Sequence, residues 1–190
     1  MVKSIYIIYL FLFLSSANGQ PLPKKILITY HSKTDHTKSM ARAVAEGIQS
    51  IPGITLVLNT INETTTQDLI DADAIIVGSP VYNANVAPEV VKFISEWPFN
   101  GNPLKNKIGA AFVSAGGFSA GEELVQTNIL HSMLVFGMII VGGEDWTSPF
   151  GASAVTDEGK YKGSLKIDDH FTEKGYALGK RVAEITKKMN

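Results

Sequence analysis

The sequence has no cysteine among its 190 residues, so it forms no disulfide and offers no thiolate to a metal ion. Its four histidines are dispersed and lack the spacing of metal ligands, so no metal site is predicted. The chain also lacks an excess of one charge, with 17 basic and 18 acidic residues and no basic block. Proteins that bind nucleic acid normally carry such a block, so no nucleic-acid partner is predicted.

Two phosphate-binding motifs are absent as well. The sequence contains no G-x-x-x-x-G-K-[ST] loop, which argues against an ATP site of the P-loop kind. It has no G-x-G-x-x-G after its first predicted strand either, which disfavours a dinucleotide-binding half.

The longest hydrophobic run, Ile5 to Leu14, is about half of the roughly 20 residues that a membrane-spanning helix needs. Lys3 precedes the run, and the small residues Ala17 and Gly19 follow it. This pattern is typical of a secretory signal peptide over residues 1–19, cut before Gln20. We therefore expect a protein that is secreted or held in the lumen of the secretory pathway. The alternative is an uncleaved signal anchor that tethers the protein to a membrane.

Short apolar runs alternate with helical patterns along residues 20–190, which predicts a single α/β domain. The apolar runs are expected to be strands at Ile26–Tyr30, Ile54–Leu58, Ala74–Val77, Ile108–Val113 and Met138–Val141. Helices are expected from just after Thr37 to about Ile51 and over about 88–97, 121–135 and 171–189, and residues 142–169 are expected to form a glycine-rich connection. Continuous apolar strands suit a parallel sheet covered on both faces. The prediction is a doubly wound, five-stranded parallel sheet of order 2-1-3-4-5, with ligands at the carboxyl ends of the strands.

The loop after the first predicted strand is the strongest functional signal. Ser32, Thr34, His36 and Thr37 fall within six residues, immediately before an amphipathic helix. A helix N-terminus carries unpaired N–H groups and the positive end of the helix dipole, so this loop predicts a phosphate site. The alternative is an ordinary turn and helix cap, which the same residue types favour.

The loops after the third and fourth predicted strands should lie at the same edge of the sheet. The first of them, 78–85, places Tyr82 between the rigid Pro80 and the amide of Asn83. The other, 114–121, is rich in glycine, which lets backbone groups approach a planar ligand closely. A phosphate site, an aromatic wall and a backbone-lined slot together favour a mononucleotide with a flat ring, and FMN fits better than ATP.

The sequence resembles the flavodoxin-like NAD(P)H:quinone oxidoreductases of the WrbA type over nearly the whole chain after the signal. The segments that carry the resemblance, in this order and spacing, are HTKSMARAVAEG, DADAIIVGSPVYNANV, SAGGFSAGEE, GMIIVGG and SPFGASAV. The resemblance implies a flavodoxin-like domain over 20–190 that binds FMN, takes hydride from NAD(P)H and reduces quinones by two electrons. It also implies a homo-oligomer, a dimer or a tetramer.

The resemblance assigns the cofactor-binding residues by position, and the chemistry it implies requires no catalytic side chain. One group would surround the FMN phosphate: Ser32, Thr34, Asp35, His36 and Thr37. A second group would line one side of the flavin ring: Pro80, Val81, Tyr82 and Asn83. A third group would line the other side: Ser114, Ala115, Gly116, Gly117, Phe118 and Ser119.

The chain departs from the family pattern at two positions that bear on this site. Asp35 stands where the family usually has glycine, and a carboxylate about 4 Å from a phosphate would cost roughly 1 to 4 kcal/mol. Asp35 could instead turn outward and cap the helix, or Lys33 could offset its charge. Phe136 stands where the WrbA type carries a histidine beside the flavin, which removes a possible proton donor. The alternative is therefore that the chain belongs to a neighbouring FMN-reductase branch of the family.

Two other functions remain open on the sequence. One is a flavodoxin-like carrier that passes single electrons and does not oxidise NAD(P)H, although such carriers are usually more acidic than this chain. The other is an exported protein that keeps the fold without reductase activity.

Overall fold

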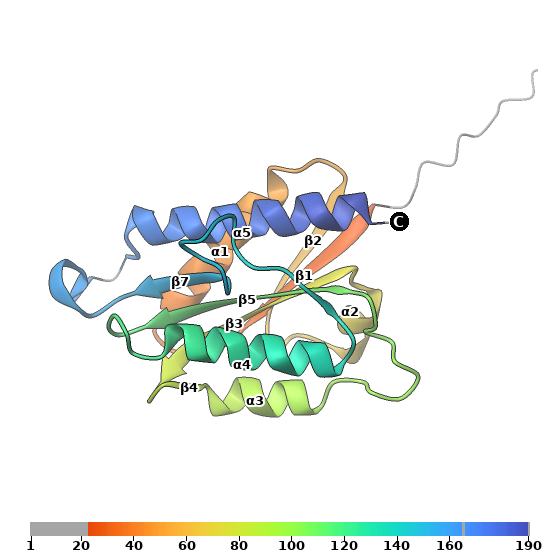
Figure 1. The fold of residues 1–190 in the computed structure, drawn as a ribbon, viewed down its shortest axis with the longest axis horizontal. Helices are drawn as coiled ribbons and strands as arrows, with labels where there is room; N and C mark the ends of the chain where they lie inside the picture. Colours follow the sequence, from red (N-terminus) through yellow and green to blue (C-terminus); the bar gives the residue numbers. More distant parts are fainter. Residues whose placement is uncertain (1–22, 165, 190) are drawn as a thin grey trace, which may run out of the picture.

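The computed structural model describes residues 23–164 and 166–189. It is an α/β fold with a mainly parallel sheet between two layers of helices, as the sequence predicted (Figure 1). The elements, in chain order, are β1 (Lys24–Tyr30), α1 (His36–Gln49), β2 (Ile54–Thr60), α2 (Thr66–Asp71), β3 (Ala74–Tyr82), β4 (Asn85–Val86), α3 (Pro88–Ser95), β5 (Ile108–Ala115), α4 (Glu122–Val135), β6 (Ile139–Ile140), β7 (Ala152–Val155), the 3-10 turn η1 (Gly159–Tyr161) and α5 (Asp169–Lys188).

The strand order is β2-β1-β3-β5-β6, with every pair in this path parallel. Because β4 only extends β3 as a hairpin, this path is the predicted doubly wound order 2-1-3-4-5. Ile28, Ile76 and Ala110 lie in register across the three central strands and are fully buried. The carboxyl ends of β1, β3 and β5 therefore lie together at the left edge of the sheet in Figure 1.

The prediction of five strands is wrong in number, because the described residues form seven. The predicted fifth strand, Met138–Val141, is present only as the short β6, which pairs with the start of β5, while β7 pairs with the end of β5. Between β6 and β7 the chain leaves the sheet at Gly142 and returns at Gly151, where the positive φ of 123° and a close approach to the Ala111 carbonyl need glycine. The connection predicted over 142–169 thus contains a strand that completes the sheet.

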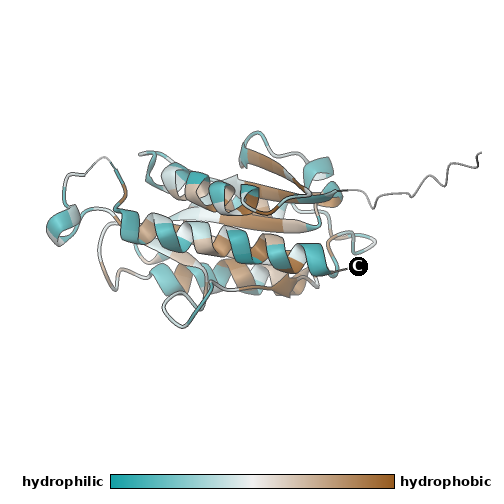
Figure 2. Cartoon of the chain, turned by 90° about the horizontal axis from the view of Figure 1, so that it is seen from above, coloured by the Kyte–Doolittle hydropathy of each residue, from teal (hydrophilic) through white to brown (hydrophobic). Residues whose placement is uncertain are grey.

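Two hydrophobic cores lie on opposite faces of the sheet. One face is covered by α1 and α5, which pack on Ile26, Ile28 and Phe112. The other is covered by α3 and α4, which pack on Leu27 and Ile75. Figure 2, seen from the side of α1 and α5, shows hydrophobic strands beneath helices in which hydrophilic and hydrophobic residues alternate. Burial of both strand faces explains the continuous apolar runs in the sequence.

Two helical glycines bring α1 and α5 unusually close together. A Cβ at Gly47 would lie 2.0 Å from the Tyr176 carbonyl oxygen, and a Cβ at Gly179 would lie 2.0 Å from the Val44 carbonyl oxygen. Glycine inside a helix costs about 1 kcal/mol relative to alanine. The close backbone contact that these glycines permit offsets this cost.

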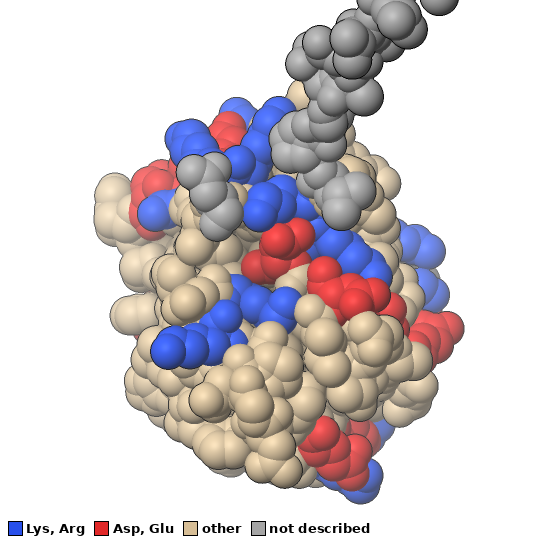
Figure 3. Space-filling model, turned by 90° about the vertical axis from the view of Figure 1, so that its right-hand side faces the viewer, with Lys and Arg blue, Asp and Glu red and all other residues tan. Residues whose placement is uncertain are grey.

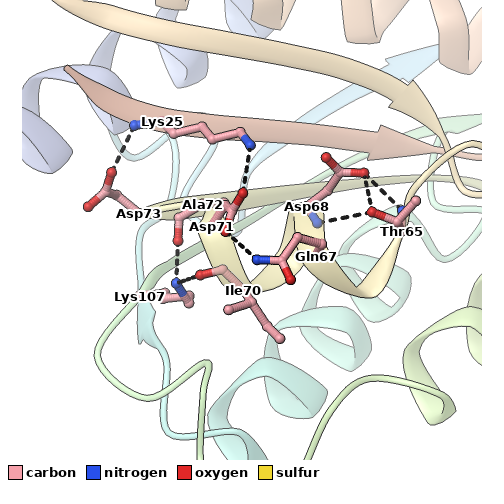
Figure 4. Close-up of polar contacts among 9 residues, drawn as sticks. All are labelled: Lys25, Thr65, Gln67, Asp68, Ile70, Asp71, Ala72, Asp73 and Lys107. Atoms are coloured by element: carbon pink, nitrogen blue, oxygen red, sulfur yellow. Dashed lines mark hydrogen bonds and ion pairs between the residues drawn. The ribbon is translucent and has the colours of Figure 1, made fainter. Parts of the chain in front are cut away.

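Helix α2 was not predicted, because it is short and mostly polar. Its start is fixed by a capping box, in which Thr65 Oγ1 accepts from the Asp68 N–H at 3.1 Å and Asp68 accepts from the Thr65 N–H at 3.0 Å. Lys107 Nζ donates to the carbonyls of Ile70 and Ala72 at the other end (Figure 4). Burial lowers the pKa of the Lys107 ammonium. The helix is therefore held at both ends by polar contacts.

The edge at which the strands begin carries charges of both signs. Lys24 pairs with Asp73 at 3.3 Å, and Lys25 pairs with Asp71 at 3.4 Å. Figure 3, which faces this edge, shows acidic and basic side chains interspersed rather than gathered by sign. These contacts tie α2 and the start of β3 to β1, at the end of the sheet opposite the loops described next.

Candidate functional site

The three loops singled out in the sequence meet at the carboxyl edge of the sheet. Thr37 Oγ1, in the first turn of α1, lies 2.8 Å from Ser114 Oγ, at the end of β5, in a buried hydrogen bond. Ser114 lies opposite Pro80 in the ladder between β5 and β3. A Cβ on Gly121 would lie 2.6 Å from the Cβ of Ala84, so the second and third loops also touch.

The first loop leaves several backbone N–H groups free at the start of α1. Among the described residues, the N–H groups of residues 34–37 have no acceptor, whereas the Lys38 N–H donates to Ser32 Oγ at 3.4 Å. Thr34 Oγ1 lies 3.2 Å from His36 Nδ1, and the other ring nitrogen of His36 lies 3.3 Å from the Ser164 carbonyl oxygen. The start of a 14-residue helix with free N–H groups and nearby hydroxyls can hold a phosphate.

Asp35 exposes its carboxylate to solvent and pairs with Lys38. Its side chain is 78% exposed and lies 3.3 Å from Lys38 Nζ. It occupies the N-cap position of α1 but makes no capping hydrogen bond, so the predicted cap is wrong. Its φ of 62° is in the left-handed region, which favours glycine and which aspartate tolerates better than most residues. A backbone requirement would therefore account for the glycine that the family resemblance implies at this position.

The second loop is a tight hairpin that extends from the sheet. Pro80 is buried in β3, Val81 and Tyr82 at its end are half-buried, and Asn83 and Ala84 form the turn. The φ values of 49° and 60° at the two turn residues are those of a type I′ turn, whose twist matches that of the strands. Asn83 thus serves the turn, while the ring of Tyr82 remains available as a wall.

Beside Tyr82, the hairpin and the start of α3 enclose an open hollow of about 670 Å³. Lys33 Nζ lies 5.3 Å from the centre of the Tyr82 ring and 3.1 Å from Glu89 Oε1. The hydrogen bond to Glu89 raises the pKa of Lys33. Lys33 therefore pairs with Glu89. The possibility that Lys33 offsets the charge of Asp35 is not realised.

The third loop follows the buried end of β5, which contains Ser114 and Ala115. Gly116 is exposed, and a Cβ there would meet nothing within 4 Å, so the space above it is open. Phe118 is 53% exposed, with its ring centre 6.0 Å from that of Tyr161 and 6.5 Å from that of Phe171. Within the described part of the chain, the N–H groups of Gly116 and Gly117 have no acceptor.

Phe136 is not brought to this site within the chain. It follows α4, at the edge where the strands begin, and its ring centre lies 5.4 Å from that of Trp97 and 5.8 Å from that of Phe99. The position that resembles a flavin-side histidine therefore belongs to an aromatic cluster beside α3. Among residues 23–164 and 166–189, no three acidic or histidine side chains gather as a metal site.

The donor set fits FMN, because free amides and hydroxyls lie at one helix start and open, glycine-lined space lies beside an aromatic ring. Residues 59–153 match the family model described as NADPH-dependent FMN reductase. A flavodoxin from Aquifex aeolicus is 30% identical over 165 residues, which cover 84% of this chain and 85% of the relative.

The chain belongs to the flavodoxin-like NADPH-dependent FMN reductase family.

An NAD(P)H dehydrogenase (quinone) from Solidesulfovibrio magneticus is 26% identical over 204 residues, covering 86% of this chain and 98% of that protein. Among solved structures, a WrbA-like flavodoxin from Agrobacterium tumefaciens has a TM-score of 0.71 at 22% identity, covering 88% of this chain and 99% of that one. A flavodoxin from the domain Archaea has a TM-score of 0.66 at 27% identity, covering 86% and 99%. These two structures share the fold of this reductase-family chain.

Membership in the family makes this protein an oxidoreductase with FMN as its cofactor, consistent with NAD(P)H as co-substrate. Neither the Lys33–Glu89 pair nor the partners of the third loop had a signal in the sequence, because each joins residues from separate elements. The predicted signal peptide, residues 1–19, lies outside the described residues. Across the described part of the chain, no helix is long and apolar enough to span a membrane.

Proposed function

We propose that this protein is an FMN-dependent NAD(P)H:quinone oxidoreductase that transfers two electrons in each turnover. The observation that carries the proposal is the meeting of three loops around the amide-rich start of α1, through the buried contact between Thr37 and Ser114 at 2.8 Å. The quinone-reducing relative supports the choice of acceptor.

In this proposal the chain binds and orients, and FMN, when bound, supplies the hydride chemistry. The free N–H groups of residues 34–37 and the hydroxyls of Ser32 and Thr34 hold the phosphate, with His36 beside them, while the buried hydroxyl of Thr37 bonds to Ser114. Asp35 contributes its backbone N–H while its carboxylate stays in solvent. Pro80–Asn83 border one side of the flavin ring, and Ser114–Ser119 border the other.

The test uses protein reconstituted with FMN and mixed with NADPH and a benzoquinone. With oxygen removed, we expect continued NADPH oxidation only when the quinone, the protein and FMN are all present, because without quinone NADPH is consumed only until the flavin is reduced. The matched control is the same protein without FMN, which should be inactive. If the reconstituted protein binds FMN but oxidises no NADPH, the reductase proposal is wrong.

The second candidate is a carrier of single electrons, which the Aquifex aeolicus relative and the archaeal structure, both described as flavodoxins, favour. A carrier would not oxidise NADPH, and in a reductive titration its flavin would take up two electrons in separate steps. A reductase of the proposed kind should be reduced by NADPH directly. The third candidate, an exported protein with this fold and no reductase activity, would fail both tests.

We also propose that the protein forms a dimer or a tetramer. Apolar side chains on the outer helices support this, since Val91, Leu134 and Val135 are each more than half exposed. Light scattering after gel filtration measures the mass in solution, and a monomer at micromolar concentration would contradict the proposal.

The proposed export of the protein rests on residues 1–19 alone. Sequencing of the N-terminus of protein recovered from the medium or the secretory lumen should give Gln20 as the first residue. Recovery of the intact N-terminus with a membrane fraction would indicate the signal anchor instead.

A further inference from the structure

Three consecutive N–H groups in the part of the third loop that follows β5 (residues 116–121) donate to carboxylates. Glu122, in the first turn of α4, accepts from the N–H groups of Ser119 at 3.1 Å and Ala120 at 3.0 Å. Glu158 Oε2 accepts from the Phe118 N–H at 2.6 Å. Hydrogen bonds to a charged acceptor are the stronger ones. The second half of the loop is therefore held by protein groups.

Glu158 reaches this loop from a distant part of the sequence. After β7 the chain continues along the third loop, where the Thr156 N–H donates to the Ala115 carbonyl at 3.0 Å and the Asp157 N–H donates to the Gly116 carbonyl at 2.8 Å. The next residue, Glu158, continues these contacts through its side chain, which accepts from the Phe118 N–H. Figure 1 shows both segments beyond the arrowheads of β5 and β7.

Gly117 makes room for the carboxylate. A Cβ at this position would lie 2.6 Å from Glu158 Oε2, so a larger residue would push the carboxylate off the Phe118 N–H. The contact thus depends on two positions far apart in the sequence, an acid at 158 and a glycine at 117.

The loop is divided into a held half and an open half. The N–H groups of residues 118–120 are used by Glu158 and Glu122. Those of Gly116 and Gly117 have no acceptor within the described residues, and the space beside Gly116 is open. Only the open half can offer backbone donors to a ligand without giving up a protein contact.

We propose that Glu158 is a positioning residue that holds the third loop in its FMN-receiving shape. This rests on the proposed role of the loop as one wall of the flavin site. The loop contains two residues with positive φ, Ser119 at 54° and Gly121 at 102°, so its shape needs to be fixed by contacts. A loop that is already ordered loses less conformational entropy on binding, which increases affinity.

The first experiment measures FMN affinity by the quenching of flavin fluorescence in the FMN-free full-length protein. We expect Glu158→Ala to weaken binding about tenfold, because the loop must then be ordered on binding. Glu158→Gln keeps an oxygen acceptor and should weaken binding less than threefold. Asp157→Ala is the matched control, because it removes a neighbouring exposed carboxylate and leaves the backbone contact of residue 157 in place.

The second experiment measures hydrogen exchange at the Phe118 N–H in the absence of FMN. We expect this amide to exchange at least tenfold faster in Glu158→Ala than in the wild type and the Asp157→Ala control. This reports the attachment of the loop without any cofactor.

The outcomes distinguish failure of the proposed function from failure of the positioning role of Glu158. Wild-type protein that binds no FMN would overturn both the proposed function and the role of Glu158. If the wild type binds FMN and Glu158→Ala binds equally well, only the positioning role is wrong. Tighter binding by Glu158→Ala would also overturn it, and would show that the carboxylate occupies an N–H group that FMN needs.

Discussion

At the scale of single residues, Asp35 shows how backbone geometry and charge can be confused in a sequence. Its carboxylate beside a predicted phosphate site suggests repulsion, but the side chain is 78% exposed and pairs with Lys38. The φ of 62° shows that the position needs a residue that tolerates the left-handed region. An aspartate can therefore replace the usual glycine and keep its carboxylate in solvent.

We predict that Asp35→Gly changes FMN affinity less than threefold, measured by fluorescence titration. Its effect on the free energy of unfolding should be under about 1 kcal/mol, because relief of the left-handed strain is opposed by the greater freedom of glycine in the unfolded chain. Asp35→Ala, which keeps the strain without the polar side chain, should destabilise by about 1 kcal/mol in chemical denaturation. A large gain in FMN affinity for Asp35→Gly, diminished by salt, would mean that the carboxylate does act on the phosphate.

At the scale of elements, the helices differ in how far the sequence defines them. Helix α1 follows from its apolar stripe, since Met40, Val44 and Ile48 are fully buried. Helix α2 has only six residues and one buried side chain, Leu69, so its periodicity gives no signal. It exists because of its capping box and of the contacts of Lys107 with the carbonyls at its end.

We predict that Gly179→Ala destabilises the protein by about 2 kcal/mol, although alanine is the better helix former. Its Cβ would meet the backbone of α1 at Val44, which cannot yield without moving the helix. Gly175→Ala is the control in the same helix, since its Cβ would meet side-chain atoms of Ala43 and Met40 at 3.1 and 3.4 Å. Urea denaturation of both variants measures the difference. Equal losses would contradict the close packing of α1 on α5.

The capping box of α2 predicts a dependence on pH. The N–H of Thr65, and then its hydroxyl, lower the pKa of Asp68 below its usual 3.8. A carboxyl with a lowered pKa in the folded state adds stability above its unfolded pKa, and this stability is lost as the pH falls through the folded value. Asp68→Asn should therefore be less stable than the wild type by about 1 kcal/mol at pH 7.

The difference between Asp68→Asn and the wild type should shrink as the pH falls from about 4 through the lowered pKa of Asp68 in the folded state, because below that pKa both side chains are neutral. Thermal unfolding across this range measures it. Gln67→Ala is the control, since Gln67 lies in the same helix outside the capping box. Its effect on stability should not change with pH as Asp68 titrates. A difference that stays constant with pH would exclude the proposed origin in the charge of Asp68.

At the scale of the whole molecule, three loops form one site because the strand order places their starting points side by side. This arrangement follows from the doubly wound order, in which β1, β3 and β5 are neighbours. The same edge receives the segment after β7, which brings Glu158 to the third loop and places Ser164 near His36. The site is therefore assembled from parts that span most of the described chain.

We predict that FMN stabilises the whole fold, because it binds the folded state and not the unfolded one. At 100 times its dissociation constant, FMN should add about 2.7 kcal/mol and raise the melting temperature by several degrees. Riboflavin, which lacks the phosphate, should stabilise much less at the same concentration if the start of α1 holds that phosphate. Differential scanning calorimetry with each ligand measures this, and equal shifts would contradict the phosphate site.

By itself, the sequence determined the class of the fold, the strand order and the position of the three loops. Buried parallel strands must be apolar on both faces, and turns and helix starts are defined by neighbouring residues. Strands and loops can therefore be predicted from short stretches of the sequence. Only the tertiary structure decided the pairing of β6 and β7 with β5, the solvent exposure of Asp35 and the contact of Glu158 with the third loop. Each of these depends on backbone approach or pairing between residues distant in the chain, to which no local pattern corresponds.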